Sequence, residues 1–96
     1  MGVKYMVFVR VEPMIRDDWR RWMQSVHIPD VMRTGCFQAY EFDYDPEADE
    51  HLICYHCPTY AAYERYQTQY APRLQEEHTR RYVGRFSVRR YVMVPI

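Results

Sequence analysis

Residues 22–37 read WMQSVHIPDVMRTGCF, and residues 70–86 read YAPRLQEEHTRRYVGRF. Each stretch carries a proline inside a helical pattern, then a glycine, then an aromatic residue that opens a strand pattern. An alternating strand pattern precedes each stretch, at residues 5–11 and 52–57. The chain therefore runs through strand, interrupted helix, glycine and strand twice, which predicts an α+β βαββαβ order in one domain over residues 1–96.

The first helix is expected to begin at residues 16–18, and its apolar stripe has helical spacing: Trp19, Trp22, Met23 and Val26. The apolar positions around Pro29 do not continue this phase. Proline removes one backbone hydrogen bond and disfavours helical geometry at the preceding residue. We therefore expect two helical segments that meet at residues 27–29.

The second helix is expected to start after Thr59, a good N-cap residue, and to end at Gly84. Its stripe is rich in tyrosine: Tyr63, Tyr66, Tyr70, Leu74, His78 and Tyr82. Pro72 predicts an interruption here too. Strands at residues 36–44 and 52–57 form a hairpin, and a last strand begins at Phe86.

Composition narrows the classes of function. Thirteen basic and thirteen acidic residues give a formal net charge of zero, which argues against a dedicated binder of nucleic acid or anionic membranes. Apolar runs are of strand length, and no signal-peptide h-region precedes the first strand. Three cysteines, an odd number, do not indicate a disulfide framework. We expect a cytoplasmic protein.

The first strand has two apolar faces, of which one should meet the helices and the other bears Met6, Phe8 and Arg10. In so short a chain the simplest cover for the second face is another copy, so we expect a homodimer. Arg10 and Arg89 share this face, where they line a dimer cavity or pair with Glu41 or Asp43.

Several polar residues are candidates for a site, and each also has a structural interpretation. His27 and Tyr70 occupy equivalent places two residues before their prolines, where they could share a proton or bind an oxygenated ligand; alternatively, His27 caps carbonyls freed by Pro29. His78 is either a hydrogen-bonded core residue or an acid or base at a pocket rim.

Arg90 alternates with apolar residues of the last strand, so it should point under the helices. A buried guanidinium needs an anionic partner. The candidates are Asp30, Glu76 and Glu77, or an anionic ligand; a bulge that turns Arg90 outward is the third alternative.

Metal-ligand residues lie close together at His51, Cys54 and His56. Strand alternation places only Cys54 and His56 on one face, and two ligands make an incomplete site. We therefore predict no metal and no cofactor.

The motif W-M-x-x-x-H-I-P-x-V-x-x-T-G-x-F (residues 22–37), with A-P-x-L-x-x-E-H (residues 71–78) and G-R-F (residues 84–86), resembles a family of short bacterial proteins described as a domain of unknown function (DUF, number 4286). The resemblance covers nearly the whole chain. It implies a ferredoxin-like fold, a four-stranded antiparallel sheet with both helices on one face, that pairs as a dimeric α/β barrel. It brings no catalytic residues with it.

These expectations combine into a small ligand-handling protein that binds an apolar or aromatic metabolite. If it is an enzyme, we expect cofactor-independent isomerisation, cyclisation or oxygenation, with His27 or His78 as the proton-transfer group. The expected substrate-binding residues are Arg10, Trp22, Tyr40, Tyr55, Tyr70 and Arg90. The alternative is a structural or regulatory homodimer without catalysis.

Overall fold

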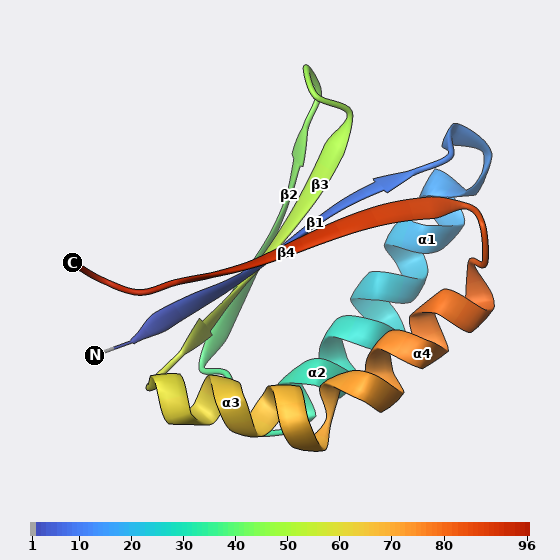
Figure 1. Ribbon diagram of the computed structural model, residues 1–96. Helices are drawn as coiled ribbons and strands as arrows, with labels where there is room; N and C mark the ends of the chain where they lie inside the picture. Colours follow the sequence, from blue (N-terminus) through green and yellow to red (C-terminus); the bar gives the residue numbers. More distant parts are fainter. Residues whose placement is uncertain (1) are drawn as a thin grey trace.

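A computed structural model describes residues 2–96 and has the α+β ferredoxin-like architecture that the sequence predicts (Figure 1). The chain runs through β1 (Val3–Val11), a 3₁₀ turn (Pro13–Ile15), α1 (Arg16–Trp22), a π-helical turn (Met23–His27), α2 (Ile28–Arg33), β2 (Ala39–Asp45), β3 (Glu50–Cys57), α3 (Tyr60–Gln69), α4 (Ala71–Arg81) and β4 (Phe86–Met93). The sheet order is β2-β3-β1-β4, every neighbouring pair is antiparallel, and all helices cover one face (Figure 1).

The pairing register is continuous along all three strand pairs, so alternate residues divide the sheet into two faces. One row across the helix-facing side joins Tyr40, Tyr55, Tyr5 and Val92, and the next joins Phe42, Ile53, Val7 and Arg90. The absence of a bulge in β4 places Arg90 on the helix side.

The first helical region is interrupted, as the sequence predicts, but by a π-helical turn rather than by a break. The backbone stays helical from Trp22 to Ile28, and the Ile28 amide bonds to the carbonyl of Met23, five residues back. Pro29 has no amide proton with which to continue the ladder. The wider turn lies just before it and changes the helical phase.

This phase change corrects one assignment in the predicted apolar stripe. Trp19 and Met23 are buried, but Val26 is 40% exposed, while Ile28 and Val31 are buried beyond the turn. A π turn holds more residues than an α turn. It therefore brings two apolar segments that are out of phase in the sequence onto the same side of the helix.

The second helical region breaks at Tyr70, where φ is −125° and ψ is −39°, and α4 begins at Ala71 with Pro72 in its first turn. Figure 1 shows the change of direction between α3 and α4. The Thr59 hydroxyl accepts a hydrogen bond from the Ala62 amide at 3.1 Å, which confirms the predicted N-cap. Within residues 2–96, none of the helices has the length and apolarity needed to cross a bilayer.

The core is a layer of aromatic and aliphatic side chains between the helices and the sheet. Trp19, Ile28, Ile53 and Leu74 are its largest fully buried side chains. Four rings have centroids within about 6 Å of the centroid of the Tyr5 ring: Phe37, Tyr55, Tyr63 and Tyr66. Such contacts add to the stability that apolar burial provides.

The opposite face of the sheet has no cover within the described chain (Figure 1). Tyr91 and Met93 are 42% and 50% exposed there, and Met6, Phe8 and Leu52 are half-buried. Arg89 forms a bidentate salt bridge with Glu50, with N–O distances of 2.9 and 3.2 Å, and its guanidinium lies over the ring of Phe8. Glu50 is thus the partner of Arg89, in place of the Glu41 or Asp43 expected from the sequence, and Arg10 lies 4.0 Å from the same carboxylate.

Substitution of Leu74 by alanine tests the packing of α4 against this core. Loss of a fully buried leucine removes transfer free energy and leaves a cavity, so the free energy of unfolding should fall by about 2–5 kcal/mol. Urea unfolding followed by circular dichroism measures the change. The exposed Thr79→Ala in the same helix is the control and should stay within about 0.5 kcal/mol of the original protein. A similar small effect for Leu74→Ala would contradict this account of the core.

Candidate functional site

A cavity lies between the helices and the sheet, and it contains four of the eight site residues predicted from the sequence. Its polar lining is His27, Gln75, His78 and Arg90, and its aromatic lining is Tyr5, Tyr55, Tyr66 and Phe86. The volume is about 40 Å³, which holds a few water molecules. The cavity therefore brings two imidazoles, a guanidinium and three phenols around a small polar space.

His78 is held by a buried hydrogen bond from a distant part of the chain. The Trp19 indole Nε1–H donates to His78 Nε2 at 2.8 Å, from α1 to α4. Because an indole nitrogen can only donate, this ring nitrogen must be the unprotonated acceptor. Neutral His78 therefore carries its proton on Nδ1. Burial lowers the pKa of His78 to about 4, and His27 and Arg90 act in the same direction.

His27 is the last residue of the π turn, and its ring faces that of His78. The two ring centroids are 5.6 Å apart at an interplanar angle of 66°, and the Trp22 ring stacks on His27 at 5.2 Å. Burial lowers the pKa of His27 to about 4; Asp30 opposes this change and Arg90 adds to it. Both imidazoles are thus neutral at physiological pH. The partner facing His27 is His78 and not Tyr70, the position equivalent to His27 in the sequence.

Arg90 lines the cavity, but the predicted buried ion pair is not formed. Within the described residues no carboxylate lies within ion-pair distance of Arg90. The three candidate partners, Asp30, Glu77 and Glu76, instead pair with Arg33, Arg73 and Arg80. The physical reason is that β4 is an edge strand, so the long side chain reaches solvent at the cavity mouth.

The phenols of the cavity stay protonated. Burial raises the pKa of Tyr5, against the opposing effects of Arg90, Gln67 and Gln75 around its hydroxyl. Burial likewise raises the pKa of Tyr66 and of Tyr55 above the usual range. These hydroxyls can therefore donate hydrogen bonds to an oxygen atom of a bound molecule.

The other residues predicted for the site lie elsewhere. Trp22 does not line the cavity itself but packs behind it, against His27 and His78, and Tyr40 is exposed on β2. Tyr70 lines a surface hollow with Asp30 and Arg73, and Arg10 lies on the opposite face of the sheet. The sequence pattern had placed Trp19 and Tyr66 in apolar stripes, but it gave no sign that Trp19 bonds to His78.

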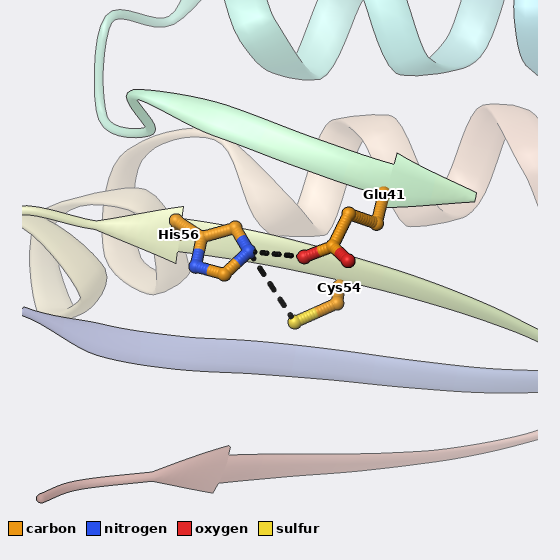
Figure 2. A group of neighbouring side chains, drawn as sticks. All are labelled: Glu41, Cys54 and His56. Atoms are coloured by element: carbon orange, nitrogen blue, oxygen red, sulfur yellow. Dashed lines mark hydrogen bonds and ion pairs between the residues drawn. The ribbon is translucent and has the colours of Figure 1, made fainter. Parts of the chain in front are cut away.

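A second group of polar side chains lies on the open face of the sheet, where β2 contributes Glu41 and β3 contributes Cys54 and His56 (Figure 2). His56 Nε2 lies 2.6 Å from Glu41 Oε1 and 3.9 Å from Cys54 Sγ. Burial and Glu41 raise the pKa of the Cys54 thiol. Sequence alternation had paired Cys54 with His56; Glu41 could have been added only from the hairpin register, in which it is the cross-strand partner of Cys54.

The buried neutral histidines predict a pH-dependent stability. The unfolded chain binds protons at histidine with a pKa near 6.5, and folded His27 and His78 bind them near pH 4, so the unfolded state holds more protons between these values. The free energy of unfolding should therefore fall as pH is lowered through this window, by up to about 1.4 kcal/mol per pH unit for each histidine. Urea unfolding at a series of pH values measures the slope.

His27→Gln removes one of three histidines whose pKa the fold lowers to about 4, the third being His51, so its slope should be shallower than that of the original chain. Carboxylates such as Glu50 titrate in both proteins and cancel in this comparison. Equal slopes would show that His27 is not held neutral by the fold.

Comparison with solved structures shows the same fold over the whole chain. A Bordetella bronchiseptica protein provisionally named an antibiotic biosynthesis monooxygenase is 13% identical, with a TM-score of 0.75 and coverage of 99% of this chain and 97% of that one. Rv0793 from Mycobacterium tuberculosis is 12% identical, with a TM-score of 0.73 and coverage of 100% and 96%. An ethyl tert-butyl ether D (EthD) family protein from Bacillus halodurans is 10% identical, with a TM-score of 0.68 and full coverage of both chains.

At these identities the likeness concerns the fold alone. A search among curated proteins gives no significant match to this chain. The family described as Domain of unknown function (DUF4286) matches residues 3–96. This match spans both proline-interrupted helices and all four strands, and the chain belongs to that family.

Proposed function

We propose that the protein binds a small apolar or aromatic metabolite between its helices and sheet, and that it moves a proton of that molecule without a cofactor. The observation that carries this proposal is a neutral His27 facing a fixed, neutral His78, beside a guanidinium with no carboxylate partner among the described residues. Isomerisation by proton transfer, cyclisation through an enolate, and cofactor-independent oxygenation of an ionised substrate each begin by removal of an acidic C–H or O–H proton. They therefore place the same demands on the site.

His27 is the proton acceptor in this proposal. Its ring makes no side-chain hydrogen bond within residues 2–96, whereas the acceptor nitrogen of His78 is already occupied by Trp19. His78 contributes its Nδ1–H and the position of its ring. A pKa near 4 makes His27 a weak base, so the substrate must itself be acidic, such as a phenol, an enol or a 1,3-dicarbonyl compound.

Arg90 stabilises the anion that proton removal leaves. A guanidinium at the mouth of a weakly solvated cavity is worth more to an oxyanion than one in water. The phenols of Tyr5 and Tyr66 can donate further hydrogen bonds. In the oxygenation variant, molecular oxygen is the oxidant: it forms a C–O bond with the substrate anion, and the resulting peroxide takes up a proton and loses water to leave a carbonyl group. The protein supplies the same groups.

The cavity of about 40 Å³ must enlarge to admit an aromatic ring. Two of the lining residues reach the surface: Arg90 is exposed and Gln75 is half-exposed. Their side chains can therefore move aside without disturbing the core. The monooxygenase name of one fold neighbour agrees with this class of chemistry, and it supports the proposal only as an analogy.

Substitution at Arg90 tests ligand binding by the cavity. Acidic phenols and 1,3-dicarbonyl compounds should raise the melting temperature of the original protein and shift the NMR signals of His27 and His78. Arg90→Met should keep the melting temperature of the free protein and weaken binding of the ionised ligand by about 10–100-fold, the effect of one lost charge-assisted hydrogen bond.

Arg65→Met, an exposed arginine of α3, is the matched control and should bind like the original. His27→Gln should still bind the acidic ligand but should lose the proposed proton-transfer activity. The proposal fails if no acidic compound binds, or if Arg90→Met binds the ionised ligand as tightly as the Arg65 control.

The alternative is a homodimer without catalysis, which the small volume of the cavity favours. With or without catalysis, we propose that a second copy covers the open face of the sheet. The half-buried and exposed apolar side chains there supply the apolar centre that stable interfaces have: Met6, Phe8, Leu52, Tyr91 and Met93. A stable interface buries about 1,200–2,000 Å² in total.

Light scattering tests this pairing. The expected mass is twice 11.9 kDa at micromolar concentration. Phe8→Asp replaces an apolar ring of this face with a charge and should return the monomer mass, because apolar contact area is lost and burial of a carboxylate is costly even beside Arg89. Met14→Glu, at a 91% exposed position between β1 and α1, is the control and should remain dimeric. A monomer for the original chain would exclude the pairing.

A reducing compartment such as the cytoplasm suits this chain. Cys36, Cys54 and Cys57 are all buried and free. The cytoplasmic location is part of the proposal and rests on these thiols.

A further inference from the structure

Three different metal-ligand groups converge on the open face of the sheet, on the side opposite the cavity. Figure 2 shows Glu41, Cys54 and His56 pointing toward one another from the adjacent strands β2 and β3. The carboxylate oxygen, the thiol sulfur and the imidazole Nε2 all lie within 4.8 Å of one another. The group joins a hard, a borderline and a soft donor.

The sheet fixes this arrangement. Cys54 and His56 are two residues apart on β3 and so share a face, and Glu41 is the registered cross-strand partner of Cys54. The three side chains therefore start from neighbouring positions on two paired strands. This is the condition under which a ligand set is held ready for an ion.

The geometry differs from that of a catalytic cysteine with a histidine base. Such a relay uses both ring nitrogens, one for the thiol and the other for the orienting carboxylate. Here the same nitrogen, Nε2, faces both Cys54 Sγ at 3.9 Å and Glu41 Oε1 at 2.6 Å. The three ligand atoms therefore surround one small space, as the ligands of a bound cation do.

We propose that Glu41, Cys54 and His56 bind one Zn²⁺ ion per chain and leave its fourth position open. Tetrahedral zinc binds sulfur, nitrogen and oxygen at about 2.0–2.3 Å, which separates the ligand atoms by roughly 3.3–3.6 Å. The observed separations reach that range with side-chain movements of about 1 Å. Thiolate and imidazole ligands together favour zinc over magnesium or calcium.

Charge and access agree with this assignment. The Cys54 thiol gives up its proton to the solvent on binding, and the thiolate and the Glu41 carboxylate then neutralise the dication. The other charges near Cys54 are those of Lys4 and Asp43, which offset each other. In the single chain the Glu41 and His56 side chains are 62% and 34% exposed, so the ion can reach the site before a second copy covers this face, and without rearrangement of the core.

Three protein ligands with one open position form the arrangement of zinc sites that bind a water molecule or a substrate, whereas structural sites have four. The proposed site is independent of the proton-transfer cavity, since the two lie on opposite faces of the sheet. It needs no second copy, because one chain supplies all three ligands.

Metal titration of the full chain tests the proposal. After removal of metal with a chelator, Zn²⁺ should bind at one equivalent per chain in competition with a chromogenic chelator. Co²⁺ in place of Zn²⁺ should give the visible bands of a tetrahedral site and a near-ultraviolet thiolate-to-cobalt band. Cys54→Ser should abolish the latter band.

Glu41→Gln, His56→Gln and Cys54→Ser should each weaken Zn²⁺ binding by at least about tenfold, the smallest effect seen even for outer partners of metal ligands. Asp43→Asn is the matched control, an acidic residue on the same face of β2, and should bind Zn²⁺ like the original chain. Glu41 is exposed, so its substitution tests the site even if a Cys54 variant does not fold. The proposal is overturned if Zn²⁺ binding is absent, if Glu41→Gln and Asp43→Asn bind equally well, or if the thiolate band survives in Cys54→Ser.

Discussion

The hydrogen bond from the Trp19 indole to His78 is the contact on which both the helix layer and the cavity depend. It joins residues 59 positions apart, and it lies in a buried layer where an unpaired donor or acceptor would cost about 1–3 kcal/mol. Because the indole donates, the proton of neutral His78 must be on Nδ1. The bond also holds the His78 ring in place, and this ring is the part of the cavity lining that His27 faces. A packing contact in the core thereby decides the chemistry of the site.

The π turn before Pro29 places the other imidazole of the cavity, that of His27. Without it, the apolar residues on either side of the proline would face different directions, and His27 would not close the cavity. The same backbone adjustment therefore solves a packing problem and positions a functional candidate. π turns are often found at functional sites.

Much of the fold follows from local patterns, because strand alternation, prolines and glycines act over a few residues. The helix-facing residues of β1 and the stripe of α3 and α4 were predictable in this way. The pairs Trp19–His78, His27–His78 and Glu41–Cys54 were not, because each joins two elements whose relative register no local pattern contains. The predicted ion pair of Arg90 was wrong for a related reason: strand alternation indicates the face of a residue but not its distance from an edge of the sheet.

Strand β3 contributes Tyr55 to one face and Cys54 and His56 to the other. The alternation of side chains along β3 therefore determines the position of both sets at once. Point mutations can change either face alone, but loss or gain of a single codon within residues 50–57 would exchange the two faces for all residues beyond it. Any lineage that retains both groups must therefore keep the length of this strand constant.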